Sequence, residues 1–101
     1  MWILRTTDPA DAVVQFRLRS GAIKTIGRAP AADFVVKAPL VSRIHCRVTA
    51  ADDALEVVDL SSTNGIYVNG KRVKRAHVKS GDVLRIGRVE FTVGKPSAIN
   101  R

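Results

Sequence analysis

The amino-acid sequence predicts an all-β fold, a sandwich or barrel of about ten short strands. Apolar residues alternate with polar ones in several short runs, which is the period of half-buried strands. Turn signals rich in Gly, Pro, Asn and Asp separate these runs. No window of the sequence holds an apolar stripe long enough for an amphipathic helix. These observations favour a single β domain in a chain of 101 residues.

The first half of the chain carries four of the expected strands. One begins at Trp2 and ends at Thr6-Thr7, before a turn signal formed by Asp and Pro. The second covers residues 14–18, in which Val, Phe and Leu alternate with Gln and Arg, and the third is the run 23–26. In the fourth, residues 44–49, Ile, Cys and Val alternate with His, Arg and Thr.

The second half adds strands at residues 55–60 and 89–93, and a very short one at residues 66–68. Two Asn-Gly pairs flank this short strand, and Asn-Gly is the strongest short-range signal for a β-hairpin. We interpret Asn69-Gly70 as an ordinary hairpin turn. Because so short a strand contributes little to a core, we expect at least one of the two turns to serve something other than folding.

One domain is expected over residues 1–95, and residues 96–101 are expected to form a flexible tail or the start of a linker. Cys46 is the only cysteine, so we expect a buried thiol and a reducing, intracellular compartment. No apolar run approaches the length of a secretory signal or a membrane span. We therefore expect a monomer without membrane contact that is cytoplasmic, or nuclear in a eukaryote.

Positive charge is concentrated in the C-terminal part of the chain. The formal net charge is +8, and residues 61–101 contain 9 Lys and Arg against 2 acidic residues, whereas residues 1–60 contain 8 against 7. The densest stretch runs from Lys71 to Lys79. Such a patch attracts polyanions, namely nucleic acid, an acidic membrane or a phosphorylated protein. Lys and Arg also protect exposed sheet edges against aggregation, and both interpretations stay open.

Two sets of residues match enzyme motifs in residue type, but their surroundings in the sequence do not suit catalysis. Ser42, His45 and Asp59 supply the residue types of a hydrolase triad, but an i, i+3 pair in an extended segment points to opposite faces. Residues 65–71 match the pattern GxxxxGK of a phosphate loop, but Arg72 stands where a Ser or Thr should hold magnesium. No helix is expected to follow either. The chain is therefore not expected to be an enzyme.

Metal and cofactor binding are not expected. His45 and Cys46 are neighbours on a predicted strand, so their side chains diverge. His77 then has no partner with the spacing of a metal ligand. We expect no metal site and no cofactor.

Three short segments lie at the ends of predicted strands. Gly27-Arg28 ends one strand, residues 42–45 lead into the next, and residues 63–65 follow the strand at 55–60. If these ends meet on one rim of a sandwich, they form a loop cluster suited to binding. Arginine can hold a phosphate with two parallel hydrogen bonds, and Ser42 adds a hydroxyl donor. The amide of Asn64 can both donate to and accept from a peptide backbone.

The same segments resemble the forkhead-associated (FHA) domain. The matching motifs are GR at 27–28, VSRIH at 41–45 and DLSSTNGIYVNG at 59–70, and the likeness runs from about residue 2 to residue 93. The resemblance implies an eleven-stranded β-sandwich of the FHA or SMAD-like class with binding loops at one end. It also implies recognition of phosphothreonine in partner proteins, and therefore phosphorylation-dependent protein interaction in signalling.

Roles for single residues follow from the resemblance alone. It implies that phosphate is bound by Arg28 and Ser42 with help from Arg43 and Thr63. Asn64 would bind the peptide main chain. Structural support of the loops would come from Gly27, His45 and Gly65. Ile44 and Lys37 depart from the residues common in the family, which leaves the peptide preference open.

A rival hypothesis from another class is a basic β domain that binds nucleic acid through the Lys71 to Lys79 stretch. Such domains offer exposed aromatic side chains on which bases stack. The chain has 5 aromatic residues (Trp2, Phe16, Phe34, Tyr67 and Phe91), and most of them are expected in the core. Nucleic acid is therefore the less favoured partner. A structural β module that docks partners without phosphate is a third possibility.

Overall fold

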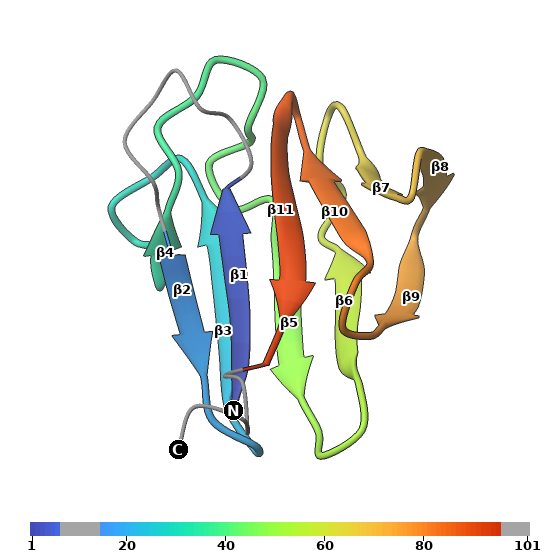
Figure 1. Cartoon of the computed structure of the whole chain (residues 1–101). Helices are drawn as coiled ribbons and strands as arrows, with labels where there is room; N and C mark the ends of the chain where they lie inside the picture. Colours follow the sequence, from blue (N-terminus) through green and yellow to red (C-terminus); the bar gives the residue numbers. More distant parts are fainter. Residues whose placement is uncertain (7–14, 96–101) are drawn as a thin grey trace.

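The molecule is a β-sandwich of two sheets (Figure 1). The computed structural model describes residues 1–6 and 15–95, which form eleven strands and no helix. The predicted all-β sandwich is confirmed, with one strand more than the alternation alone indicated. The predicted tail at 96–101, and the turn after Thr6-Thr7, lie outside the described residues.

The two sheets contain six and five strands. The six-stranded sheet has the order β2 (Gln15–Leu18), β1 (Trp2–Thr6), β11 (Val89–Gly94), β10 (Val83–Ile86), β7 (Ile66–Val68) and β8 (Lys71–Val73). The five-stranded sheet has the order β4 (Phe34–Val35), β3 (Ile23–Gly27), β5 (Cys46–Ala50), β6 (Leu55–Asp59) and β9 (Arg75–Val78). Neighbouring strands are antiparallel except β3 and β4, which run parallel.

The core lies between the sheets and follows from the alternation along each strand. In β5, for example, Cys46, Val48 and Ala50 are buried while the residues between them are half-buried. The largest fully buried side chains come from both sheets: Trp2, Leu4, Leu18, Ile66, Leu84, Ile86 and Phe91 from one, Ile26, Val48 and Leu55 from the other. The predicted burial of Cys46 is confirmed. Desolvation, followed by the negative charge of Asp59 on the neighbouring strand, raises the pKa of this thiol.

One predicted strand begins later than expected. Residues 44 and 45 precede β5, which starts at Cys46. The segment before it folds back on itself, because the backbone amide of Ser42 donates to Nδ1 of His45 at 3.0 Å. Although Ile44 fits the period-two pattern, it is therefore not a strand residue. It belongs to the segment that leads into β5.

The second Asn-Gly pair forms the predicted hairpin. Asn69 and Gly70 have φ values of 50° and 85° and join β7 to β8 with two residues. Positive φ at both positions is the geometry that a two-residue hairpin turn needs. Asn69 also holds the neighbouring loop, because its side-chain oxygen accepts from the Val83 amide at 2.9 Å.

The sandwich has two distinct ends. β1 starts and β11 ends at the lower end in Figure 1, where Trp2 Nε1 donates to the Ala51 carbonyl at 2.7 Å. Lys95 lies over the Trp2 ring at 4.5 Å from its centroid. The segments that lead out of β3, into β5 and out of β6 lie at the upper end. The candidate binding loops and the ends of the described chain are therefore at opposite ends.

Candidate functional site

The three segments predicted to form a loop cluster meet at the upper end of the sandwich. The Arg28 amide donates to the Ser42 carbonyl at 2.9 Å, which holds the end of β3 against the loop that precedes β5. The Thr63 amide donates to the Ser42 hydroxyl at 3.1 Å, which adds the loop that follows β6. Ser42, in the loop before β5, therefore accepts hydrogen bonds from both of the other segments.

Gly27 allows the close approach of two of these segments. A Cβ placed on Gly27 would lie 2.1 Å from the carbonyl oxygen of Arg43, a distance that no side chain tolerates. Glycine is thus required because the backbone of Arg43 passes directly over this position. The next residues continue the contact, since the Ala29 amide donates to the Arg43 carbonyl at 3.0 Å.

Arg28 and Asn64 are held by consecutive carbonyls of one loop. Asn64 Nδ2 donates to the Leu40 carbonyl at 2.9 Å, and Arg28 Nε donates to the Val41 carbonyl at 3.0 Å. These bonds hold a guanidinium and a side-chain amide against the two residues that precede Ser42. Arg28 is exposed, and among the described residues its terminal guanidinium nitrogens have no acceptor. They are free to bind an anion.

His45 lies fully buried beneath the cluster. Its Nδ1 accepts from the Ser42 amide at 3.0 Å, so the ring proton is on Nε2, which donates to the Gly65 carbonyl at 2.8 Å. The ring therefore joins the loop before β5 to the loop after β6. Both ring nitrogens are therefore hydrogen-bonded to the backbone.

The residues of the possible triad do not form one. Ser42 and His45 are in contact, contrary to the expectation that they diverge, because the segment between them is bent. However, the contact uses the backbone amide, and the Ser42 hydroxyl accepts from Thr63 instead. Asp59 accepts hydrogen bonds from the amide and the hydroxyl of Ser62. No proton relay from Ser42 through His45 to Asp59 exists.

The loop around Asn64 is shaped by a serine that the sequence analysis did not single out. The Ser62 hydroxyl donates to Asp59 Oδ1 and accepts from the Gly65 amide at 2.9 Å. Gly65 has a φ of 77°, which favours glycine. The signal for this turn was present, because Asp and Ser side chains commonly close turns onto backbone amides.

Arg72 lies next to the cluster, and the sequence analysis named it only as a departure from the phosphate-loop pattern. A Cβ placed on Gly65 would be 2.5 Å from Arg72 Nε, so the guanidinium lies against the backbone of Gly65. The register explains the position, since Arg72 pairs with Tyr67 across the Asn69-Gly70 hairpin. A two-residue turn fixes that pairing, so the signal was available in the sequence.

The basic stretch from Lys71 to Lys79 is divided between the two sheets. β8 is the edge strand of the six-stranded sheet, and β9 is the edge strand of the five-stranded sheet. Arg75 on β9 lies 3.6 Å from a carboxylate oxygen of Glu56, and His77 lies 3.9 Å from the same oxygen. The stretch therefore lines two sheet edges. This position agrees with the protection of edges against aggregation.

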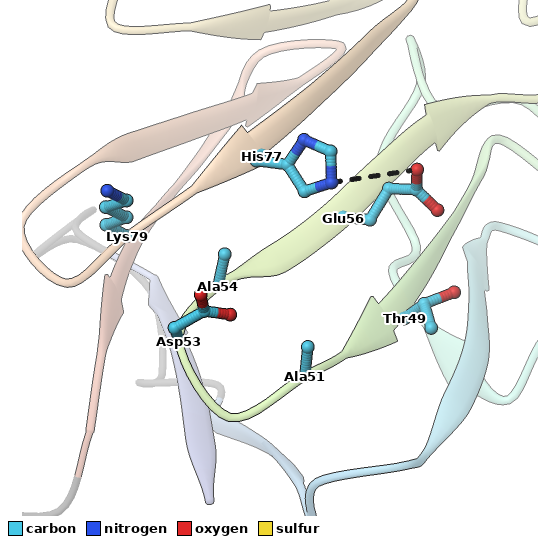
Figure 2. A pocket seen from close by; sticks show the side chains of 7 residues that line it. All are labelled: Thr49, Ala51, Asp53, Ala54, Glu56, His77 and Lys79. Carbon is cyan, nitrogen blue, oxygen red and sulfur yellow. Dashed lines mark ion pairs between the residues drawn. The ribbon is translucent and has the colours of Figure 1, made fainter.

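A shallow hollow lies on the outer face of the five-stranded sheet, away from the loop cluster. Figure 2 shows its lining, in which His77 and Glu56 point toward one another. Its lining residues are Thr49, Ala51, Asp53, Ala54, Glu56, His77 and Lys79. Residues 51–54 form the β5–β6 connection at the lower end of the sandwich. The hollow is thus separate from the candidate binding loops.

Residues 1–6 and 15–95 are the ranges that the structure describes. Within these ranges no three side chains of His, Cys, Asp or Glu gather in a way that could hold a metal ion. No helix in the same ranges is long and apolar enough to cross a membrane.

The fold and the loop cluster define the class of the protein. A rigid β scaffold that displays an arginine, a hydroxyl and an amide in loops at one end is a binding module. The chain belongs to the FHA domain family, because the family model of the FHA domain matches residues 24–87. The resemblance seen in the sequence is therefore confirmed.

Similarity to individual proteins agrees with this assignment. The chain is 40% identical over 74 residues to the ABC transporter ATP-binding/permease protein Rv1747 of Mycobacterium tuberculosis, covering 73% of this chain and 8% of that protein. It is 37% identical over 75 residues to the glycogen accumulation regulator GarA of the same species, covering 72% of this chain and 46% of GarA. The chain thus spans less than half the length of both relatives.

Solved structures of FHA domains have a similar fold over nearly the whole chain. The FHA domain of the CT664 protein from Chlamydia trachomatis has a TM-score of 0.88 and 25% identity, covering 95% of this chain and 98% of that one. A structure from a study of phosphothreonine-dependent FHA domain interactions has a TM-score of 0.81 and 32% identity, covering 95% and 97%.

Proposed function

We propose that this chain binds phosphothreonine in partner proteins and so mediates phosphorylation-dependent protein interaction in signalling. The observation that carries the proposal is the convergence of Arg28, Ser42 and Asn64 on one rim, where contacts with residues 40–42 hold them together. The related structure described for phosphothreonine-dependent interactions supports the same chemistry.

The phosphate is held by the guanidinium and the hydroxyl. Arg28 donates through its terminal nitrogens, which its bond to the Val41 carbonyl leaves unused. The Ser42 oxygen already accepts from Thr63, so its own proton is free to donate to a phosphate oxygen. Arg43 is exposed and adds positive charge, and Thr63 completes the rim.

Asn64 binds the peptide main chain next to the phosphothreonine. Its Nδ2 is fixed by the Leu40 carbonyl, which orients the amide plane. The side-chain oxygen then accepts from a peptide amide, and the second Nδ2 hydrogen donates to a peptide carbonyl. Gly27, His45 and Gly65 act indirectly, because they set the approach of the loops that carry these groups.

The affinity expected of this site suits a reversible interaction. Two or three charge-assisted hydrogen bonds contribute roughly 1.5–3 kcal/mol each. After the cost of association, the net affinity is on the order of micromolar, about −8 kcal/mol. A phosphate carries a charge of about −1.5 to −2 at neutral pH, so dephosphorylation of the partner removes most of the binding.

Fluorescence anisotropy with phosphothreonine peptides tests the proposal. An oriented peptide library first supplies a ligand, and Arg28→Ala, Ser42→Ala and Asn64→Ala are then each expected to bind it about ten- to a hundredfold more weakly. Arg17→Ala, on the exposed face of β2, is the matched control and is expected to bind like the parent. Equal binding by all the variants and the parent, or by phosphorylated and unphosphorylated peptide, would refute the site.

Nucleic acid is the alternative ligand, and the packing of the aromatic rings argues against it as the main one. The basic stretch follows the edge strands of both sheets, β8 and β9. Three of the aromatic rings are packed, because Phe16 lies against both Phe34 and Phe91. Any basic surface binds DNA more weakly as salt rises, so the deciding measurement is the effect of Arg28→Ala on DNA binding. No effect is expected.

We further propose that the domain acts inside the cell as a monomer. The buried, unpaired Cys46 fits a reducing compartment. Positive charge along the outer strands of both sheets opposes edge-to-edge pairing of two copies.

A further inference from the structure

A short row of side chains extends from the loop cluster onto the outer face of the six-stranded sheet. Tyr67 on β7 pairs with Arg72 on β8 and with Arg85 on β10. On either side of Tyr67 along β7, Ile66 is buried and Val68 packs against the core, so Tyr67 points the other way. The row Arg72, Tyr67 and Arg85 therefore crosses the outer face of three adjacent strands.

The row is continuous with the candidate phosphate site. The guanidinium of Arg72 lies against the backbone of Gly65, the residue that follows Asn64. A peptide held by Asn64 therefore passes within reach of Arg72. An extended peptide advances roughly 3.3 Å per residue, so only a residue close to the phosphothreonine can make this contact.

The guanidiniums of the row form no ion pair with a carboxylate of the described residues. Arg85 lies over the Tyr67 ring, with Cζ 4.1 Å from the centroid, and its Nε is buried with no hydrogen-bond acceptor among the described residues. Glu90 pairs with Arg85 across β11, but the ion pairs found within residues 1–6 and 15–95 both belong to Glu56. The two guanidiniums of the row are therefore available to an external anion.

We propose that the row Arg72, Tyr67 and Arg85 binds an acidic side chain, Asp or Glu, that lies near the phosphothreonine in the partner. The inference rests on the proposed function and names part of the peptide that the same site selects. A guanidinium engages a carboxylate with paired hydrogen bonds, and the Tyr67 ring holds the Arg85 guanidinium in place by a cation–π contact. Arg75 on β9 already forms an ion pair with Glu56, so its guanidinium is not available to the partner in the same way.

The experiment compares a phosphothreonine peptide with neutral flanks to a series in which Glu replaces one flanking residue at a time. At low salt, at least one position is expected to bind about two- to fivefold more tightly with Glu. Arg72→Gln and Arg85→Gln are expected to remove this gain, while both still bind the neutral phosphopeptide. Arg17→Gln, on the same sheet at its opposite edge, is expected to keep the gain.

Each result decides the inference. It is overturned if no position gains affinity with Glu, or if the gain survives in both variants. Thermal unfolding of each variant excludes loss of fold, and Arg72→Gln is the safer test because Arg72 is exposed. If the parent does not distinguish phosphorylated from unphosphorylated neutral peptide, the proposed function fails and the inference falls with it.

Discussion

Gly27 has the strictest steric requirement among the described residues of the binding rim. The space that a side chain would need is filled by the carbonyl of Arg43, part of the peptide unit that the Ala29 amide binds. Any larger residue must push the end of β3 away from the loop before β5. Since Arg28 follows directly, the guanidinium would move with it.

Gly27→Ala is therefore expected to lower both stability and phosphopeptide affinity. The overlap of the new methyl group with backbone is expected to cost about 2–3 kcal/mol of unfolding free energy, measured by urea denaturation. Gly94→Ala is the control, because a Cβ at Gly94 meets nothing within 4 Å. Wild-type stability and affinity in Gly27→Ala would contradict the geometry of this contact.

His45 and Arg43 are neighbours in the loop but are expected to fail in different ways. His45→Ala leaves the Ser42 amide and the buried Gly65 carbonyl without their partner, which is expected to cost about 3 kcal/mol of stability. Arg43→Ala removes an exposed side chain and is expected to change stability by less than about 0.5 kcal/mol.

For Arg43→Ala, phosphopeptide affinity is expected to change although stability hardly does. Arg43→Ala is expected to weaken phosphopeptide binding at low salt, because it removes charge beside the phosphate. Urea unfolding and anisotropy on the same samples make the comparison. A His45→Ala variant as stable as the parent would show that the ring does not brace the loops.

Sequence reasoning placed the side chains of the rim better than the backbone that holds them. Arg28, Ser42 and Asn64 stand at strand ends and have chemistry that suits an anion or a peptide. The carbonyls of Leu40 and Val41, which orient Arg28 and Asn64, carry no mark in the sequence because every residue has a carbonyl. Their role depends on the path of an irregular loop.

At the scale of elements, the loop between β9 and β10 is tied to the hairpin between β7 and β8. Asp82 accepts from the Lys79 amide at 2.8 Å and from Asn69 Nδ2 at 3.1 Å. These two hydrogen bonds hold the pKa of Asp82 below its ordinary value of 3.8, the backbone bond having the larger effect. The ionised carboxylate is therefore the form that stabilises this junction.

This junction predicts a dependence of stability on pH. Because the folded state lowers the pKa of Asp82, its contribution is complete above the ordinary value of 3.8 and is lost as pH falls through the lower, folded value. The loss of thermal stability between pH 7 and acidic pH is expected to be smaller for Asp82→Asn than for the parent. The variant keeps an acceptor for the Lys79 amide.

Asp53→Asn is the control for this measurement. Its carboxylate is exposed and makes no hydrogen bond with the described residues. Its acid sensitivity is expected to match that of the parent. If Asp82→Asn loses stability with falling pH as steeply as the parent, the two hydrogen bonds do not favour the ionised form.

Predictability differed between strands for physical reasons. β11 and β2 were predicted from alternation, because each faces the core on one side and solvent on the other. β4 contains only two residues, too few to show a period. It exists because it pairs in parallel with the end of β3, a contact between distant segments that no local pattern contains.

At the scale of the whole molecule, the class of fold was predictable and the assignment of edges was not. Short alternating runs with frequent turns are typical of a sandwich. Which strands lie at the edges depends on sheet order, and β8 and β9 follow one another in the chain yet belong to different sheets. One continuous run of basic residues is thereby split over two edges.

The separation of the chain ends from the binding rim has a further consequence for how such a domain can be joined to others. Polypeptide attached before β1 or after β11 would leave from the end of the sandwich that carries no binding loop (Figure 1). Two copies in tandem would each keep an open rim. A partner phosphorylated on two threonines could then be captured bivalently, with avidity set by the reach of the linker.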